Sequence, residues 1–227
     1  MKLTTIAHTA GYYYRPRVDK ALLREFHEGL IVLSGCPSGE FIKSLNSKDL
    51  SKAEEVIKSY LDIFGEGNFY LELQRHPYQQ SLDLATDEHV RKDLEELLEI
   101  QTRTLQGIKE FSSRMGIPVA ATNDCHYIKK EDAEAQDALL CIQTGRLLQE
   151  TDRLRMIDTP DYYLKSPEEM AEIYKDLPQV LENTVKIAEQ VDLEIPLGIA
   201  QFPVFETPKE ESSMEYLREL TYKQAKE

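Results

Sequence analysis

One stretch of the chain reads Pro118-Val119-Ala120-Ala121-Thr122-Asn123-Asp124-Cys125-His126-Tyr127, an apolar run that ends in a carboxylate and an imidazole two residues apart. A short apolar run bounded by Gly116 and by a polar cluster is typical of a buried strand in a parallel sheet. In an extended backbone, side chains two residues apart point to the same face. We therefore expect a strand over residues 117–122, with Asp124 and His126 converging just beyond its carboxyl end.

Two further apolar runs, at residues 30–35 and 69–73, also predict strands. Between the three strands lie residues 50–64 and 88–114, whose apolar residues recur at three- and four-residue steps and therefore predict amphipathic helices. The order strand, helix, strand, helix, strand is typical of right-handed crossovers in a parallel sheet or barrel. The sequence therefore predicts an α/β fold.

The pattern changes to helices alone after about residue 130. We expect the boundary between the β/α part and the helical part to divide the chain into residues 1–150 and 151–227. Proline recurs over residues 192–211, which predicts an extended or linker-like segment. The expected helices of this region cover residues 131–144, 166–174 and 177–191 and begin again at Ser213.

The charge of the chain limits its possible partners. Its 27 Lys and Arg residues against 41 Asp and Glu residues give a formal net charge of −14, which repels a polyanion. This composition argues against the chain being the main surface that grips a nucleic acid. It is compatible with a nucleic-acid enzyme whose carboxylates collect divalent cations.

Cysteine usage and hydropathy indicate the compartment. Cys36, Cys125 and Cys141 are an odd number without CxxC spacing, so neither a disulfide framework nor a zinc ribbon is indicated. No run is long enough to span a membrane, and the first residues lack the pattern of a secretory signal. We expect a cytoplasmic protein with reduced thiols and no membrane partner.

Asp124 and His126 are the first candidate site. An oxygen donor beside a nitrogen donor suits Zn²⁺, Mn²⁺ or Fe²⁺. The alternative is that Asp124 caps the following helix and that His126 makes only local hydrogen bonds.

The ends of the other two predicted strands carry further candidates. Cys36 follows the first strand in the same topological position, where a reduced thiol serves as a soft metal ligand, as a nucleophile or as a small buried residue. Glu72, Gln74 and His76 alternate along the end of the second strand and so share one face. In one interpretation they line the same cleft, either as metal ligands or as side chains that contact the ligands. In the other they form a polar strand end that makes hydrogen bonds to neighbouring loops.

Several segments together resemble a known family. In one collinear order, the chain resembles the bacterial C-family replicative DNA polymerases, the family of the DNA polymerase III alpha subunit. It looks like the later part of their polymerase-and-histidinol-phosphatase (PHP) domain, followed by the entry into the palm. The resemblance implies an incomplete, distorted β/α barrel over residues 1–150 and a mostly helical connection over residues 151–227. The segments that carry it are residues 11–19, 29–36, 69–74, 119–127, 161–170 and 182–184.

The resemblance also implies a metal site. It assigns Cys36, Asp124 and His126 as ligands of Zn or Mn at the carboxyl ends of the strands. Glu72 and His76 are candidates for groups that contact these ligands rather than the metal itself. Where such a site is complete, the family implies a metal-dependent 3′-5′ exonuclease; elsewhere the domain supports the polymerase. The implied partners are DNA, deoxynucleotides and other replicase subunits, including a separate proofreading exonuclease, with Mg for the polymerase reaction.

The chain departs from the family pattern at both ends. It has no HxH motif, with which PHP domains begin, and it lacks the paired aspartates of the palm. We therefore expect a fragment that is inactive alone and that self-associates or is partly disordered. Two alternatives stay open: a free-standing PHP-type metal-dependent phosphoesterase, and a non-catalytic scaffold that docks a proofreading exonuclease.

Overall fold

The computed structural model of the protein describes residues 1–199, 205–208 and 211–225. The chain divides into two compact units, Met1–Val191 and Asp192–Glu227. The expected boundary at residues 150–151 falls inside the first unit, because Tyr174 and Val180 belong to its hydrophobic core.

The first unit is built on a parallel sheet with the order β1-β2-β3. Its strands are β1 (Val32–Leu33), β2 (Phe69–Gln74) and β3 (Val119–Thr122). The α/β class, the three strands and their parallel arrangement are confirmed. β1 is shorter than expected, since Gly35 has a φ of +86°, where the chain leaves the extended conformation.

The first crossover consists of α3 (Glu40–Asn46) and α4 (Leu50–Phe64). The bounds of α4 match the apolar periodicity of residues 50–64. At its start, the Asp49 side chain accepts a hydrogen bond from the Lys52 backbone N–H at 2.9 Å, and the helix ends at Gly65. Its apolar stripe is buried, with Ala53, Val56 and Ile57 in the core.

The second crossover consists of α5 (Tyr78–Leu84) and α6 (Glu88–Met115). Asp87 caps α6 by accepting from two backbone N–H groups, and Gly116 ends it in the left-handed conformation, with a φ of +70°. Gly107 allows α6 to approach α3 closely, because a Cβ at this position would lie 2.6 Å from the Leu45 side chain. The expected helix over residues 88–114 is confirmed.

Two helices after residue 165 complete the core. They are α8 (Pro167–Ile173) and α9 (Gln179–Gln190), and α9 packs against β3. The Asn183 amide donates to the Val119 carbonyl at 2.8 Å, which covers the outer edge of β3. Ser166 caps α8 as its sequence predicts, with Pro167 at the first helical position.

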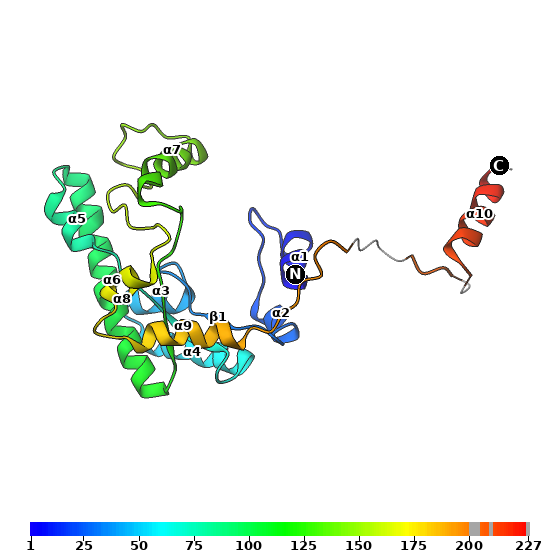
Figure 1. Ribbon diagram of the computed structural model, residues 1–227, viewed down its shortest axis with the longest axis horizontal. Coiled ribbons are helices and arrows are strands. Elements are labelled where there is room, and N and C mark those ends of the chain that lie inside the picture. Colours follow the sequence, from blue (N-terminus) through cyan, green and yellow to red (C-terminus); the bar gives the residue numbers. More distant parts are fainter. Residues whose placement is uncertain (200–204, 209–210, 226–227) are drawn as a thin grey trace. The chain divides into compact units, whose positions relative to one another are not determined.

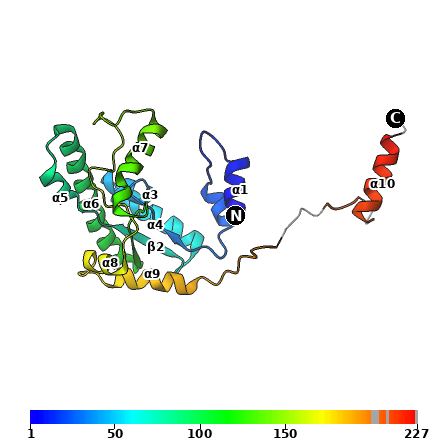
Figure 2. The same cartoon turned by 45° about the horizontal axis from the view of Figure 1, so that its top comes forward.

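The remaining helices of the first unit are α1 (Lys2–Thr9), α2 (Lys20–Glu25) and α7 (Ala133–Thr144), and a 3₁₀ turn at Lys130–Asp132 precedes α7. Within this unit, α7 and α9 lie on opposite sides in both ribbon views (Figures 1 and 2). The second unit contains α10 (Ser213–Gln224), capped by Ser212, where helical propensity was expected to resume. The expected extended segment over residues 192–211 lies partly outside the described residues.

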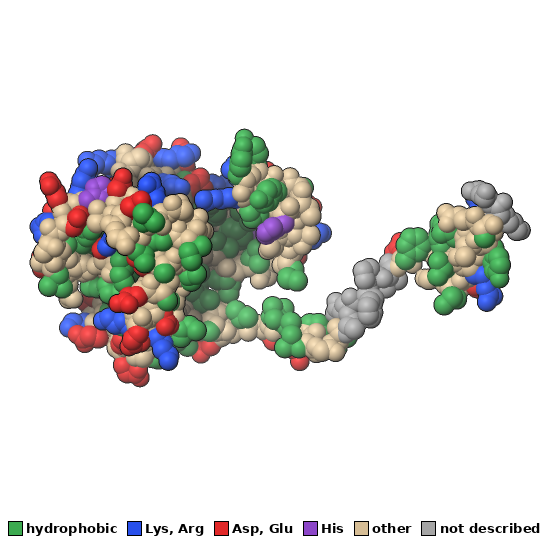
Figure 3. All heavy atoms as spheres, turned by 90° about the horizontal axis from the view of Figure 1, so that it is seen from above, with side chains coloured by type: hydrophobic (Ala, Val, Ile, Leu, Met, Phe, Trp, Pro, Cys, Tyr) green, Lys and Arg blue, Asp and Glu red, His purple; other side chains and the backbone are tan. Residues whose placement is uncertain are grey.

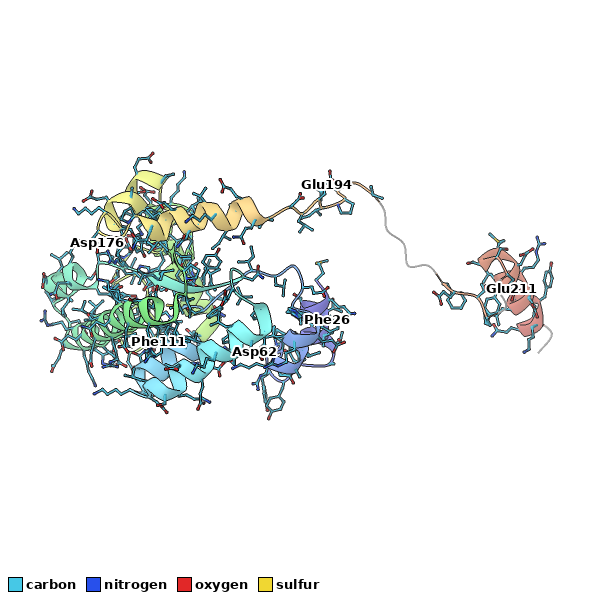
Figure 4. The ribbon with its side chains drawn as sticks, turned by 90° about the horizontal axis from the view of Figure 1, so that it is seen from below. Phe26, Asp62, Phe111, Asp176, Glu194 and Glu211 are labelled. Atoms are coloured by element: carbon cyan, nitrogen blue, oxygen red, sulfur yellow. The ribbon has the colours of Figure 1, made fainter. Side chains whose placement is uncertain are left out.

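An ion pair fastens the end of β2 to the loop after α8. Arg75 donates two hydrogen bonds to Asp176, at 2.6 and 2.9 Å, and one to the Ile173 carbonyl at 3.0 Å. Asp176 is labelled in Figure 4. The hydrogen bonds from Arg75 lower the pKa of the Asp176 carboxyl. The pair therefore stabilises the fold above the ordinary carboxyl pKa, and this contribution is lost as the pH falls through the lowered value.

We therefore expect Asp176→Asn to decrease stability near neutral pH and to make little difference in strong acid. Urea unfolding of both proteins at pH 7 and below pH 3 measures this. An equal loss at both pH values would contradict it. Because Asp176 is largely exposed, the effect should be small.

Candidate metal site at the carboxyl edge of the sheet

The three strands end at the same edge of the sheet because they run parallel. Cys36 follows β1, His76 follows β2, and Asp124 and His126 follow β3. Glu72 lies within β2, in register with Ala120 of β3. The fold therefore brings all five sequence-predicted residues to one edge, where they form two separate groups.

Asp124 and His126 form the first group. The Asp124 Oδ2 and His126 Nε2 atoms are 3.5 Å apart, and both side chains are partly exposed. The two side chains converge as expected, but the backbone between them is not the expected extended strand. Asp124 is left-handed, with a φ of +49°, and the strand has already ended at Thr122. Asp124 does not cap the following helical segment, whose N-cap is Lys129.

Cys36 belongs to the second group. It lies in the turn after Gly35 and is partly buried, and its carbonyl accepts from the Gly39 backbone N–H at 2.7 Å. Its side chain lines a cavity of about 30 Å³ together with Glu72 and His76. Asp124 and His126 are not among the residues that line this cavity. The rest of the wall comes from Gly35, Pro37, Ile42, Gln74, Tyr78, Leu97, Ile100, Gln101 and Thr104.

Glu72 connects the ends of all three strands. Its Oε1 atom accepts from the Thr122 hydroxyl at 2.6 Å and from the Gln74 amide at 2.9 Å. Its backbone N–H donates to the Ser34 hydroxyl at 2.9 Å. These bonds hold the carboxylate in one orientation at the cavity wall.

His76 is buried, at 7% exposure, and is held at both its backbone and its ring. Gln101 pairs with the backbone of His76, accepting from its N–H at 2.8 Å and donating to its carbonyl at 3.0 Å. The ring Nδ1 lies 3.0 Å from the Asp161 carboxylate. Because a carboxylate only accepts, this nitrogen carries the proton that it donates.

Sequence reasoning did not assign a role to Asp161. The Lys165 ammonium lies 3.0 Å from the second oxygen of Asp161 and also donates to Asn123, the residue after β3. Asn123 in turn donates to the carbonyls of Asp161 and Tyr163. The segment 161–170 was among those that carry the family resemblance, but nothing in the sequence placed Asp161 against a histidine 85 residues away.

A tyrosine pair touches both groups. The hydroxyls of Tyr78 and Tyr162 are 2.8 Å apart. The Tyr162 ring centroid lies 4.4 Å from that of His76 and 5.8 Å from that of His126. Burial raises the pKa of both tyrosines, and the nearby Asp124 and Asp161 charges raise it further, so both stay protonated at neutral pH.

The donor types at this edge fit a divalent cation, since a thiol, imidazoles and carboxylates are its usual protein ligands. The buried Nε2 atom of His76, which has no hydrogen-bond partner, also fits a ligand role. Within the described part of the chain, however, no three His, Cys, Asp or Glu side chains are close enough together to hold a metal ion. Of these donors, Asp124 and His126 are in direct contact.

One face of the molecule shows, among the described residues, no continuous basic patch of the kind that grips a nucleic acid. On the face shown in Figure 3, Lys and Arg side chains are interspersed with Asp and Glu. None of the helices formed by the described residues has the length and apolar content needed to cross a bilayer.

The first part of the chain matches a known class of domain. Residues 1–76 match the PHP domain, a class consistent with the small parallel sheet and its crossover helices. Relatives then extend the match over nearly the whole chain. The DNA polymerase III subunit alpha of Borreliella burgdorferi is 38% identical over 223 residues, which cover 97% of this chain and 18% of the relative.

The same subunit of Treponema pallidum is 35% identical, over 98% of this chain and 17% of its own length. That of Thermus aquaticus is 33% identical, again over 98% of this chain and 17% of its own length. The chain is thus similar to DNA polymerase III alpha subunits over nearly its whole length. It spans less than a fifth of the length of these relatives.

Proposed function

We propose that the chain serves as part of a replicative DNA polymerase alpha subunit, the protein that carries out DNA-directed DNA synthesis. The observation that supports this proposal is collinear similarity to such subunits over 97% of the chain. Residues 1–150 are then part of the PHP domain, and residues 151–227 connect it to the palm. DNA and deoxynucleotides are the substrates of the whole protein, with Mg²⁺ at its polymerase centre.

The proposed metal ligands are Cys36, Asp124 and His126, which lie at one edge of the sheet. A Zn or Mn ion bound there would lower the pKa of a bound water and polarise a phosphodiester, as 3′-5′ exonuclease proofreading requires. Within this chain, the 3.5 Å contact with His126 orients the Asp124 carboxylate, and the bonds from Thr122 and Gln74 orient Glu72.

His126→Ala in a polymerase that contains this segment tests the proposal. Mutation of a residue that hydrogen-bonds to a metal ligand typically lowers metal affinity roughly 10- to 100-fold. Because His126→Ala removes a direct ligand, we expect a larger fall in affinity. Metal-dependent 3′-5′ nuclease activity should fall with it, while DNA synthesis persists. His89→Ala is the matched control, since His89 lies on α6 with a partly exposed side chain. Unchanged metal content and nuclease activity in His126→Ala would refute the assignment.

A second candidate is a structural role, in which the domain supports the polymerase and docks a separate proofreading exonuclease. The observation in its favour is that the described residues contain no assembled group of three donors. Nuclease activity that co-purifies with a second subunit, and is absent from the alpha subunit alone, would support it. A free-standing phosphoesterase has less support, because the similarity to polymerase subunits continues far beyond the PHP match.

A further inference from the structure

The loop between α1 and α2 presents three consecutive tyrosines to solvent. Tyr12, Tyr13 and Tyr14 are 60%, 63% and 81% exposed. A run of aromatic residues ahead of a helix would ordinarily pack against that helix, but these exposures exclude such packing, and α2 buries none of its own residues. Large exposed side chains that lie side by side usually mark a surface that binds a partner.

The backbone of this loop is a tight turn. The Tyr13 N–H donates to the Arg15 carbonyl at 3.1 Å. Gly11 lets the start of the loop meet its end, since a Cβ at this position would lie 2.1 Å from the Arg17 carbonyl oxygen. Between them Tyr14 has a φ of +58°, a left-handed conformation that a side chain of this size rarely adopts and that is often kept for function. The loop projects from the body of the first unit in both ribbon views (Figures 1 and 2).

Two arginines of the same loop have no counter-ion. Arg15 and Arg17 are exposed, and neither pairs with a carboxylate in the described part of the chain. Most other arginines of the first unit do form such pairs, as Arg153 does with Asp137. Residues 1–20 contain four Lys and Arg residues and one Asp, although the whole chain has a net charge of −14. Positive charge therefore collects where the tyrosine rings are exposed.

Two of the three tyrosine rings are available to a partner. The Tyr13 ring is engaged within the loop, since the Arg17 guanidinium lies 5.2 Å from its centroid and the Tyr14 ring meets it edge-to-face at 4.6 Å. No hydrogen bond or ring contact with a described residue engages Tyr12. Tyr14 is the most exposed of the three. Tyr12 and Tyr14 can therefore stack on a flat ligand with the guanidinium groups beside them.

Aromatic rings interleaved with arginines are typical of surfaces that bind single-stranded nucleic acid. Bases stack on the rings, and phosphates pair with the guanidinium groups. In a duplex the base faces are already stacked on one another, so they are not free to bind the rings. A membrane surface would favour Trp, Phe or Leu beside the basic residues, and residues 11–18 contain none of these.

We propose that the loop of residues 11–18 binds single-stranded DNA, with bases stacked on Tyr12 and Tyr14 and phosphates paired with Arg15 and Arg17. The inference rests on the proposed function in taking DNA rather than RNA as the nucleic acid. It is separate from the proposed metal ligands, because no residue of the loop lines the cavity beside Cys36. The net charge of −14 opposes the binding of a polyanion, so we expect a weak local contact.

Fluorescence anisotropy of a short labelled oligothymidylate, titrated with the chain at low salt, is the first test. Replacing Tyr12 and Tyr14 together by Ala should weaken binding at least about fivefold, the lower end of what one stacked base contributes. Replacing both by Phe should preserve the affinity, because the rings remain. Tyr222→Ala is the matched control, since Tyr222 is 66% exposed on α10. Unchanged affinity in the double Ala variant, or an equal loss in Tyr222→Ala, would overturn the proposal.

The salt dependence of the same titration tests the phosphate contacts. Arg15→Gln combined with Arg17→Gln should lower the affinity and reduce the slope of log affinity against log salt by up to about 1.4, because each phosphate contact with a single strand contributes about 0.7. Arg146→Gln removes a partly exposed charge after α7 and should leave the slope unchanged. An unchanged slope in the double variant would overturn the phosphate contacts. All these positions are exposed, and circular dichroism verifies that the variants fold.

Competitors distinguish DNA from other partners. Unlabelled oligothymidylate should displace the probe, whereas oligouridylate and vesicles of phosphatidylcholine with phosphatidylserine should do so less well. Tyrosine-dependent binding to the vesicles or to oligouridylate, without binding to oligothymidylate, would overturn the proposal. The absence of any oligonucleotide binding would also overturn it, and would leave the proposed function intact, since DNA synthesis by a polymerase that contains this segment tests that function separately.

Discussion

Phe111→Ala should lower the free energy of unfolding of the first unit by about 3–5 kcal/mol, the usual cost of deleting a buried aromatic ring. Phe111 is 0% exposed and lies on α6 within the main core cluster (Figure 4). Its ring packs edge-to-face on Phe41 of α3, with centroids 5.6 Å apart. The substitution therefore removes apolar burial and leaves a cavity between the two crossover helices.

Urea unfolding followed by circular dichroism measures this effect. Leu84→Ala is the control, because Leu84 is 82% exposed and should change stability by no more than about 0.5 kcal/mol. A loss below about 1 kcal/mol for Phe111→Ala would show that α6 does not pack on α3 as described.

Arg153→Met should destabilise the segment around α7 by about 3–5 kcal/mol, because it leaves a buried carboxylate without its partner. The side chains of Arg153 and Asp137 are only 1% and 8% exposed and share two hydrogen bonds, at 2.7 and 2.6 Å. The same hydrogen bonds raise the pKa of the Arg153 guanidinium. Arg153 also donates to the Glu150 carbonyl at 3.0 Å, which fixes the loop after α7.

The double variant Arg153→Met with Asp137→Leu distinguishes an unpaired charge from lost packing. Replacing both members of a buried pair by apolar residues is often neutral, so the double variant should recover most of the stability. Native-state hydrogen exchange of residues 133–159 measures both proteins. A double variant as unstable as the single one would contradict the explanation.

The sequence predicted those helices and strands whose bounds are set by residues close together in the chain. The bounds of α4 follow from a repeating apolar stripe, an aspartate cap and a terminal glycine, all within one short stretch. The parallel order of the strands follows from their alternation with helices. By contrast, α5 is one short helix of seven residues without a distinctive pattern, and it was not expected.

The site was only partly predictable, for a different reason. Its five residues were predicted at one edge from strand direction alone, and the strands are parallel as that prediction requires. The division into two groups depends on contacts between remote segments, such as His76 with Asp161. Asp124 has a left-handed backbone although it is not a glycine, and no local sequence pattern predicted this conformation.

The central proposal is that a divalent cation binds at the carboxyl edge of the parallel sheet, where Cys36, His76, Asp124 and His126 follow the strands. A crystal structure of the chain grown with Zn²⁺, with an anomalous difference map at the zinc edge, tests it most directly. We predict a zinc peak at the carboxyl edge of the sheet, bonded to at least one of these side chains. Zinc bound only elsewhere, or Cys36 at the opposite end of the sheet from Asp124, would contradict the account.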